Sequence, residues 1–369
     1  MTAPAVTVLM SVHNGEAFLR QAVDSILAQT FRDFEFLIVD DGSTDGTGAI
    51  LRSYSDPRVV VVRNDRCLTL PVSLNRGLRA ARAPLVARAD ADDVYVPTRL
   101  ARQVSYMERS QQIGASSAAF WTTDEKGGIL ERHSPPCRDE QIRLMLLWTA
   151  CLSHPLAIFR RELVLTFGGY DERFWVAQDY DLWARLRDHT IFGNLSAPLM
   201  RHRSHPRSSA ATRGLAGREL GCSVSRRLMS RYLGRELGGP EAAGLRRLLC
   251  GHGPIKADLL PLVLSLLAEL LLQARARESS STFAWLRRAA SASLLQQSIA
   301  LVRRNSAASR RLFWRALRLW PPRMATLAAV KQVGRLLGIK RAHFLPAHQG
   351  RSGTARHTPT PEDPAEDGA

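Results

Sequence analysis

Residues 34–42 read Phe-Glu-Phe-Leu-Ile-Val-Asp-Asp-Gly, an almost unbroken apolar run that ends in two carboxylates and a glycine. A short run of this kind, bounded by turn residues, is typical of a strand buried on both faces of a parallel sheet. Similar runs at residues 6–12, 59–62 and 85–89 predict further strands, and apolar residues at helical spacing lie between them. The alternation predicts an α/β fold with a mainly parallel, Rossmann-like sheet.

Composition divides the chain into three parts. Beyond residue 211, Leu, Ala and Arg dominate and β-branched residues are few, which is a helical composition. From residue 346 onward, prolines and glycines prevail with hardly an apolar side chain, so burial cannot offset the entropy of ordering that segment. We therefore expect an α/β domain over residues 1–211, an all-helical, basic region over residues 212–345 and a flexible tail over residues 346–369.

The chain of 369 residues has an ordinary hydrophobic content of 45% and a formal net charge of +17. Its five cysteines are odd in number and far apart, without a C-x-x-C pair, which argues against a disulfide framework or a structural zinc site. The N-terminus lacks the features of a secretory signal, and the longest apolar run, residues 259–272, is shorter than the roughly 20 residues that span a bilayer. These features predict a cytoplasmic protein without a transmembrane segment.

The first of three acidic clusters covers residues 40–46 and directly follows the predicted strand at residues 34–39. Asp, Gly and Ser all favour turns, so a structural turn explains the cluster as well as a binding site does. As a site, a carboxylate such as that of Asp41 can accept the imide N–H of uracil or thymine. Ligands of open α/β sheets bind beyond the carboxyl ends of strands, which is where this cluster lies.

The second cluster, Asp90-Ala91-Asp92-Asp93, follows the predicted strand at residues 85–89. Two carboxylates in D-x-D spacing on an extended segment point to the same side and suit a hard cation such as Mg²⁺ or Mn²⁺. Such a cation can stabilise a pyrophosphate as a leaving group. An acidic turn before Pro97 is the structural alternative.

The third cluster, Gln178-Asp179-Tyr180-Asp181, opens a predicted helix that runs through Ala184 and Leu186. Asp is a favoured N-cap and is stabilising in a first helical turn, so a helix cap is the interpretation that the cluster favours when it is taken alone.

Taken together and in chain order, the clusters resemble the family 2 inverting glycosyltransferases over about the first 210 residues. The segments that carry the resemblance are Ser-Val-His-Asn-Gly-Glu at 11–16, Ser-Ile-Leu-Ala-Gln-Thr at 25–30, Val-Asp-Asp-Gly-Ser-Thr-Asp-Gly-Thr at 39–47, Leu-Asn-Arg-Gly at 74–77 and Arg-Ala-Asp-Ala-Asp-Asp at 88–93. His-Pro at 154–155, Gly-Gly-Tyr-Asp at 168–171, Gln-Asp-Tyr-Asp-Leu-Trp at 178–183 and Arg-Ser-His-Pro at 203–206 continue it.

The resemblance implies a nucleotide-diphospho-sugar transferase fold and a role for each matching residue. Asp41 would contact the base, Asp92 would ligate Mn²⁺ or Mg²⁺, and Asp179 would be the catalytic base. Asp90 would lie against the ribose or a metal-bound water. The nucleotide-sugar site would also contain the side chains of Asn14, Arg88 and His205. His205 falls in a segment that closes over the diphosphate in similar enzymes. Gln178 departs from the family pattern, because many members have Glu there, but the base itself is kept.

The function that these expectations define is inverting transfer of a sugar from a nucleotide-diphospho-sugar, with UDP as the expected nucleotide. The acceptor would be a hydroxyl of a glycan or lipid-linked glycan in cell-surface polysaccharide synthesis, and a polyprenyl phosphate is the alternative. A non-catalytic sugar-nucleotide binder is a further alternative, which the complete set of acidic residues disfavours. His154 is left out of the catalytic set, because a histidine before a strand is more often a hydrogen-bonded core residue.

The basic region suggests a different class of partner. Residues 281–345 contain no Asp or Glu and many Arg and Lys, which is a feature of nucleic-acid binders, but no familiar nucleic-acid module is visible. In residues 310–320 the apolar Phe313, Ala316, Leu317 and Trp320 fall on one helical face, opposite a face of three arginines: Arg311, Arg315 and Arg318. A basic amphipathic helix with Trp suits an anionic membrane surface on the cytoplasmic side. A solvated basic face on a helical bundle is the alternative.

Overall fold

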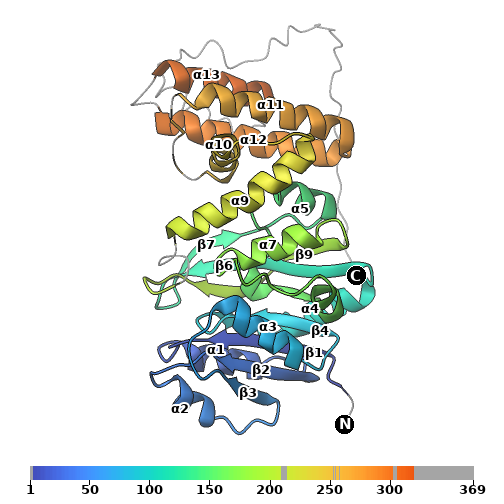
Figure 1. Cartoon of the computed structure of the whole chain (residues 1–369), viewed down its shortest axis with the longest axis vertical. Helices are drawn as coiled ribbons and strands as arrows, with labels where there is room; N and C mark the ends of the chain where they lie inside the picture. Colours follow the sequence, from blue (N-terminus) through green and yellow to red (C-terminus); the bar gives the residue numbers. More distant parts are fainter. Residues whose placement is uncertain are drawn as a thin grey trace, which may run out of the picture. The chain divides into compact units, whose positions relative to one another are not determined.

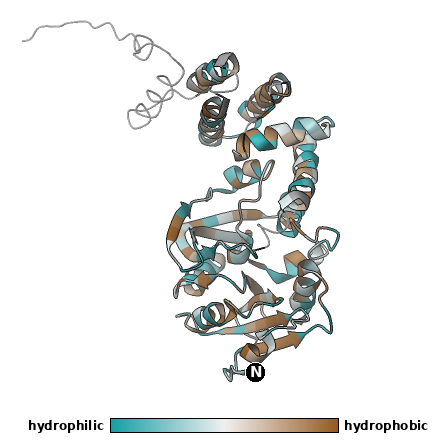
Figure 2. Ribbon diagram, turned by 90° about the vertical axis from the view of Figure 1, so that its left-hand side faces the viewer, coloured by the Kyte–Doolittle hydropathy of each residue, from teal (hydrophilic) through white to brown (hydrophobic). Residues whose placement is uncertain are grey.

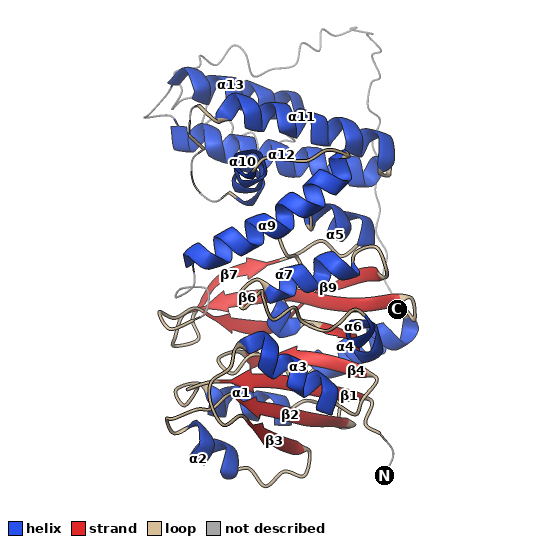
Figure 3. Cartoon of the chain, in the orientation of Figure 1, coloured by secondary structure: helices blue, strands red, loops and turns tan. Residues whose placement is uncertain are grey.

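The computed structural model describes residues 3–208, 214–251, 253, 255–256, 258–301 and 306–319. These residues form a nine-stranded sheet in the order β3-β2-β1-β4-β8-β6-β9-β5, with β7 paired to β6 (Figures 1 and 3). The strands are β1 Val6–Val12, β2 Phe34–Asp40, β3 Val59–Arg63, β4 Leu85–Ala89, β5 Val94–Tyr95, β6 Ile113–Thr123, β7 Ile129–His133, β8 Ile158–Arg160 and β9 Ile191–Arg203. The predicted α/β class is confirmed.

The first four strands are parallel, as the sequence predicts, and the other half of the sheet is mixed. β3, β2, β1 and β4 pair in parallel, and so do β6 and β9. β8 joins the two halves by pairing antiparallel to β4 and to β6, and the short strands β5 and β7 are antiparallel to β9 and β6. The strands that precede the first two acidic clusters, β2 and β4, therefore lie in the parallel part of the sheet.

Strand β1 is the point at which the strand order reverses, because β2 lies on one side of it and β4 on the other. Val12 at the end of β1 pairs with Asp40 at the end of β2, and Met10 pairs with Ala89 at the end of β4. Ligands of open α/β sheets bind in the crevice at such a switch point. The register thus brings the first two acidic clusters to the same edge of the sheet.

The two faces of the sheet are covered by different helices, because successive residues of a strand point to opposite faces. Met10 and Ile38 pack with α1 Leu19–Leu27 and α4 Arg99–Arg109 in one hydrophobic core. Leu9 and Val39 face α3 Leu70–Ala80 in a second core. Strands buried on both faces need apolar residues throughout, which explains the unbroken runs and the hydrophobic colour of several strands in Figure 2. The remaining helices of this half are α2 Thr47–Arg52, α5 Asp139–Met145, α6 Arg161–Thr166 and α7 Gln178–Leu186.

The helices that follow residue 213 extend the second core instead of building a separate one. They are α9 Gly214–Leu233, α10 Gly239–Cys250, α11 Leu260–Arg277, α12 Ser280–Leu301 and α13 Ser306–Leu319. Val224 of α9 and Leu245 of α10 belong to the same buried cluster as Leu9 and Trp183. The hydroxyl of Ser225 donates to the carbonyl of Leu147 at 2.7 Å, a polar contact within this junction. The helical region is therefore continuous with one face of the sheet.

Two of the four apolar residues predicted on one face of residues 310–320 are in the protein interior. Phe313 and Ala316 of α13 are fully buried, and the hydroxyl of Ser291 in α12 donates to the carbonyl of Ala316 at 2.9 Å. Phe313 and Ala316 are therefore unavailable to a membrane, and the part of the membrane hypothesis that relies on these two residues is wrong. Trp320 lies outside the described residues, and so does the proposed tail. None of the described helices is long and apolar enough to cross a bilayer.

Candidate active site

The loops after β1 and β2 are joined at the edge of the sheet by Asn14. Its backbone N–H donates to the hydroxyl of Ser43 at 3.0 Å, and its side-chain oxygen accepts the N–H of Thr44 at 2.8 Å. The backbone of Asn14 adopts a positive φ of 51°, a conformation that Asn tolerates better than most residues. Asn14, which the resemblance assigns to nucleotide-sugar binding, fixes the loop that carries Asp41.

Asp41 is buried directly after β2, and its two carboxylate oxygens differ in how many hydrogen bonds they accept. Oδ1 accepts the side-chain N–H of Asn64 at 2.7 Å and the backbone N–H of Leu68 at 3.0 Å. Oδ2 has the thiol of Cys67 at 3.7 Å. Gly42 follows with a φ of 67°, and a side chain there would collide with the backbone of Arg66. Asp41 is thus held rigidly with lone pairs left on Oδ2, whereas the neighbouring Asp40 accepts the N–H of Ser43 and makes the turn.

A pocket of about 350 Å³ lies beside Asp41. It is lined by residues of the loop after β3 and by one arginine of α3: Asn64, Asp65, Arg66, Leu68 and Arg76. Arg76 donates to the carbonyl of Arg63 at 3.0 Å, which holds this loop against α3. The pocket and the oriented carboxylate of Asp41 lie together at the end of the parallel strands.

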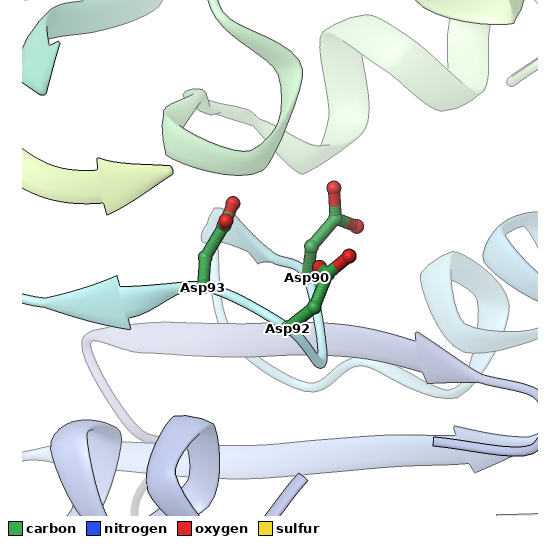
Figure 4. Close-up of side chains that lie close together, drawn as sticks. All are labelled: Asp90, Asp92 and Asp93. Carbon is green, nitrogen blue, oxygen red and sulfur yellow. The ribbon is translucent and has the colours of Figure 1, made fainter. Parts of the chain in front are cut away.

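The second cluster brings three carboxylates together, those of Asp90, Asp92 and Asp93. Their oxygens lie within 4.8 Å of one another, and Figure 4 shows the three side chains projecting from one short turn. The D-x-D segment is a turn and not the extended segment that the spacing suggests. The carboxylates of Asp90 and Asp92 still converge, and Asp93 adds a third that the sequence interpretation did not select.

Each of these carboxylates has a cationic or potentially cationic partner. Arg88, which is fully buried in β4, forms an ion pair with Asp90. Nε2 of His205 lies 3.0 Å from Oδ2 of Asp92, and Nδ1 of His202 lies 3.0 Å from Oδ1 of Asp93. The partners moderate the repulsion between three acids in close contact.

Arg88 and His205 are both brought to the cluster, as the resemblance implies, but in different ways. Arg88 has no exposed surface, so it contacts Asp90 from the protein interior and is not available for direct contact with a ligand. His205 packs on Phe18 with ring centroids 4.8 Å apart, and its Nδ1 is buried without a hydrogen-bond partner among the described residues. The segment after β9 therefore lies against Asp92.

Asp93, His202 and Arg203 are site residues that sequence reasoning missed. Asp93 is fully buried and accepts the backbone N–H of Arg203 at 2.9 Å. The Arg203 guanidinium lies over the Phe18 ring at 4.6 Å and donates to the carbonyl of Asp92 at 3.0 Å. Burial lowers the pKa of His202, but the hydrogen bond and charge of Asp93 outweigh it and raise this pKa to about 9. The available signal was the third acid of the cluster, Asp93, since a spare carboxylate directly after a D-x-D pattern needs a partner.

The cluster fits a hard divalent cation through two of its three acids. Asp90 and Asp92 are partly exposed, at 31% and 30% of their side-chain surface, and offer carboxylate oxygens of the kind that Mg²⁺ and Mn²⁺ prefer. Asp93 is fully buried, and both its oxygens lie within 3.2 Å of Nδ1 of His202. The chemistry of the donor set thus suits an ion held by Asp90 and Asp92, with Asp93 positioning the segment that carries His202 and His205.

Asp179 lies at the second position of α7 and is not its N-cap. The cap position is Ala177, which has a left-handed backbone with a φ of 61° and makes no side-chain cap. The interpretation of Asp179 as a helix cap is therefore wrong. Burial raises the pKa of Asp179 to about 6, against the lowering effect of nearby backbone N–H groups, and Asp90 adds to the increase. The lowering effect of the helix N-terminus on this pKa is therefore smaller than the raising effect of burial. The carboxylate is more basic than that of an ordinary Asp and is still mainly ionised at neutral pH.

Asp181, one half-turn after Asp179, anchors α7. Its buried carboxylate pairs with Arg185 of the same helix and with Arg227 of α9, each at 2.7 Å. Arg185 also donates to the carbonyl of Gly169 at 2.6 Å. The helix that carries Asp179 is thus tied both to the preceding Gly-Gly turn and to the C-terminal helices.

Tyr170 and His154 form a buried pair near the same site. Nε2 of His154 lies 2.8 Å from the hydroxyl of Tyr170, and burial with the charge of Arg88 lowers the pKa of His154 to about 3. Asn75 fixes the backbone of Tyr170 from both sides, accepting its N–H and donating to its carbonyl, each at 2.8 Å. Gly169, with a φ of 68°, is required because a side chain would meet Asn75. His154 is a hydrogen-bonded core residue, as predicted.

An open α/β sheet with carboxylates at its switch point agrees with the nucleotide-diphospho-sugar transferase fold that the sequence resemblance implies. Staphylococcus aureus TarS has the same fold: the structure of its residues 1–349 in complex with UDP-GlcNAc matches with a TM-score of 0.53 at 16% identity, over 84% of this chain and 90% of that one. The sequence profile described as "Glycosyl transferase family 2" matches residues 7–167.

Relatives by sequence agree with this assignment. The amylovoran biosynthesis glycosyltransferase AmsE of Erwinia amylovora is 30% identical over 204 residues, which are 54% of this chain and 76% of AmsE. An uncharacterized glycosyltransferase of Methanocaldococcus jannaschii is 32% identical over 190 residues, which are 50% of this chain and 65% of that relative. The chain belongs to glycosyl transferase family 2.

Proposed function

We propose that this protein transfers a sugar from a UDP-sugar to a hydroxyl of a glycan or lipid-linked glycan, with inversion at the anomeric carbon. The observation that carries the proposal is Asp179, a carboxylate of pKa about 6 that lies within electrostatic range of Asp90 and its partner Arg88. Polysaccharide synthesis is the proposed context, since AmsE is named for amylovoran biosynthesis. Residues 1–211 would form the catalytic domain, and residues 212–345 the helical region that supports it.

Asp179 is the proposed general base. Inversion requires the acceptor oxygen to attack the anomeric carbon from the side opposite the leaving diphosphate while it loses its proton. A base works best when its pKa is near the operating pH, because it is then both ionised and able to hold a proton. A pKa of about 6 satisfies both conditions at pH 7, whereas an ordinary Asp with a pKa near 3.8 would be a weaker base.

Asp92 is the proposed protein ligand of Mn²⁺ or Mg²⁺, with Asp90 against the ribose or a metal-bound water. The cation, when bound, would neutralise charge on the departing diphosphate. Arg88 holds Asp90 in place through their ion pair. His205 lies 3.0 Å from Asp92, and it would contact the diphosphate once the donor is bound.

Asp41 is the proposed reader of the nucleotide base. Asn64 and Leu68 fix its Oδ1, so Oδ2 is the oxygen available for the imide N–H of uracil. Cytosine has no N–H at the equivalent ring nitrogen, so a carboxylate would reject it. Asn14 would act by holding the loop that presents Asp41.

The acceptor is proposed to be a glycan or a lipid-linked glycan, with a polyprenyl phosphate as the alternative. We further propose that the protein works in the cytoplasm and attaches peripherally to the inner face of the membrane, where lipid-linked acceptors would be reached. The positive charge of the helical region supports this location, and a nucleic-acid partner is not proposed.

A panel of nucleotides tests the donor assignment most directly. We expect UDP and TDP with Mn²⁺ to raise the melting temperature by several degrees and CDP to have little effect, because affinity for the folded state adds to stability. The Asp41→Asn variant, which can donate as well as accept, should lose the discrimination against CDP. Equal stabilisation of the native protein by UDP and CDP would contradict the role of Asp41.

A further inference from the structure

A groove of about 1000 Å³ lies between α11 and α13, far along the chain from the catalytic residues. Both helices pack on α12, and the groove separates one from the other. Its apolar lining includes Leu260 and Leu264 of α11 and Leu312 of α13. The groove is thus a surface of the helical region and takes no part in the site described above.

Four arginines of α13 also line the groove: Arg310, Arg311, Arg315 and Arg318. All four are exposed, and none forms an ion pair with any residue in the part of the chain that the structure describes. Trp314, 37% exposed, lies between them along α13. Three other arginines of the helical region do have acidic partners: Arg227 with Asp181, Arg231 with Asp188 and Arg235 with Glu269.

Folding of the bundle does not require these arginines. The buried residues of α13 include Phe313 and Ala316, and α13 is hydrogen-bonded to α12 through Ser309 and Ser298. Four like charges within nine residues repel one another and cost stability unless something anionic approaches. Their position beside an apolar lining indicates a ligand that is both anionic and apolar.

We propose that the groove between α11 and α13 docks the protein on a bilayer that contains anionic phospholipid, with phosphates on the arginines and Trp314 at the interface. Arg forms strong hydrogen bonds with phosphate, and Trp prefers the boundary between headgroups and acyl chains. A free phosphate would not use the apolar lining. The chain's own residues 320–345 are a poor occupant by charge, because they contain no Asp or Glu.

This inference deepens the proposed membrane location and is independent of the proposed sugar transfer. It also replaces the mechanism that the sequence suggested. The buried face of α13 cannot meet a membrane, whereas the arginines beside the groove can.

Vesicle cosedimentation of the full chain tests the proposal, with phosphatidylcholine vesicles with and without phosphatidylglycerol. The native protein should bind the anionic vesicles, less so as salt is raised, and not the neutral ones. Replacing Arg310, Arg311, Arg315 and Arg318 with Gln should weaken binding by about tenfold or more. Trp314→Ala should weaken it by about threefold at unchanged charge.

The matched control replaces four exposed arginines of the sheet half, Arg52, Arg79, Arg102 and Arg109, with Gln. It lowers the net charge equally and should retain native vesicle binding. Equal losses in the two quadruple variants would overturn the proposal, because binding would then follow net charge alone. If the groove variant does not keep the native melting temperature, Arg311→Gln with Arg318→Gln replaces it.

Two further measurements distinguish the binding of other anions from the binding of a lipid surface. Inorganic phosphate, at the phosphate concentration of the vesicles and at constant ionic strength, should not displace the protein. Displacement would identify a free-anion site and reject the docking surface. Groove-dependent binding to duplex DNA without vesicle binding would likewise reject it in favour of nucleic acid. Stabilisation by UDP, measured on the same variants, reports separately on the donor site.

Discussion

The sheet edge and the α13 groove both concentrate charged side chains, but only those at the sheet edge have partners of opposite charge among the described residues. At the edge, Asp90, Asp92 and Asp93 converge and each has a partner: Arg88, His205 and His202. Along the groove, four exposed arginines lie without an ion pair among the described residues. The first arrangement fixes each atom through hydrogen bonds, and the second leaves long side chains free to adapt.

This difference indicates two kinds of task. Chemistry at a reacting centre requires groups fixed to fractions of an ångström and pKa values shifted by burial. Attachment to a charged surface requires only net attraction and tolerates motion. Substitutions at the sheet edge should therefore change turnover or donor affinity by large factors, whereas substitutions in the helical region should change location or stability by smaller ones.

The largest effect is expected from Asp179→Asn. The variant keeps the shape of the side chain and removes its basicity, so turnover should fall by roughly 10²-fold or more with donor binding retained. Because burial raises the pKa of Asp179, the ionised carboxylate costs folding free energy above that pKa, and Asn removes the cost. The melting temperature at pH 7 should therefore not fall, and calorimetry with a sugar-transfer assay measures both.

A matched control for this variant is Asp171→Asn, which removes a carboxylate from the preceding turn whose partner is the exposed Arg173. Its turnover should remain within about twofold of native, since surface ion pairs contribute little. Near-native turnover of the Asp179→Asn variant would show that Asp179 is not the general base.

Loss of the cation should affect donor binding next. Without it, two phosphates would lie against the carboxylates of Asp90 and Asp92 and be repelled. We expect Asp92→Ala, or a chelator, to weaken UDP-sugar affinity by about 100-fold, with Mn²⁺ restoring the chelated native protein but not the variant. Titration calorimetry measures this, and undiminished affinity in EDTA would exclude the metal role of Asp92.

The pH dependence of the rate should follow the ionisation of Asp179. Its pKa is raised to about 6, so the basic form is lost as the pH falls through that value. We expect kcat/KM to be about tenfold lower at pH 5 than on its plateau near neutral pH. The difference in stability between native protein and the Asn variant should vanish below about pH 4, where both side chains are neutral. A rate that stays flat down to pH 4.5 would contradict the shifted pKa.

The smallest effect concerns Arg227, which connects the two regions. Its removal leaves the buried carboxylate of Asp181 with Arg185 alone, so Arg227→Gln should lower the free energy of unfolding by about 1–2 kcal/mol. Turnover should fall a few-fold, because α7 carries Asp179. Arg231→Gln is the control, since Arg231 is 73% exposed and pairs with the more accessible Asp188. Equal stability of the two variants would show that α9 does not brace α7.

The sequence predicted the parallel half of the sheet because hydrophobic runs there coincide with strands. β1 and β4 have the predicted bounds, and β2 is one residue longer. The mixed half of the sheet was not predicted. β5 and β8 have two and three residues, too few for periodicity, and β9 contains Pro198 at a shift of register with β6.

The candidate site shows the same limit. Local patterns pointed to the clusters of Asp41 and Asp92, which follow strands, whereas the proposed role of Asp179 came only from the family resemblance. The partners of the acids come from distant parts of the chain: His202 is 109 residues from Asp93, and His205 is 113 residues from Asp92. Nothing in the spacing of single residues encodes such contacts, so the partners of Asp93 emerge only from the fold.

The core shared by the sheet and the C-terminal helices has a consequence during synthesis. Leu147 and Trp148 are covered in the finished protein by residues of α9, α10 and α12, among them Ser225, Arg246 and Trp285. A ribosome synthesises from the N-terminus, so Trp285 is added 137 residues (285 minus 148) after Trp148. The nascent chain therefore carries an uncovered apolar surface for several seconds at about 5–20 residues per second, and this surface is a binding site for chaperones until α12 arrives.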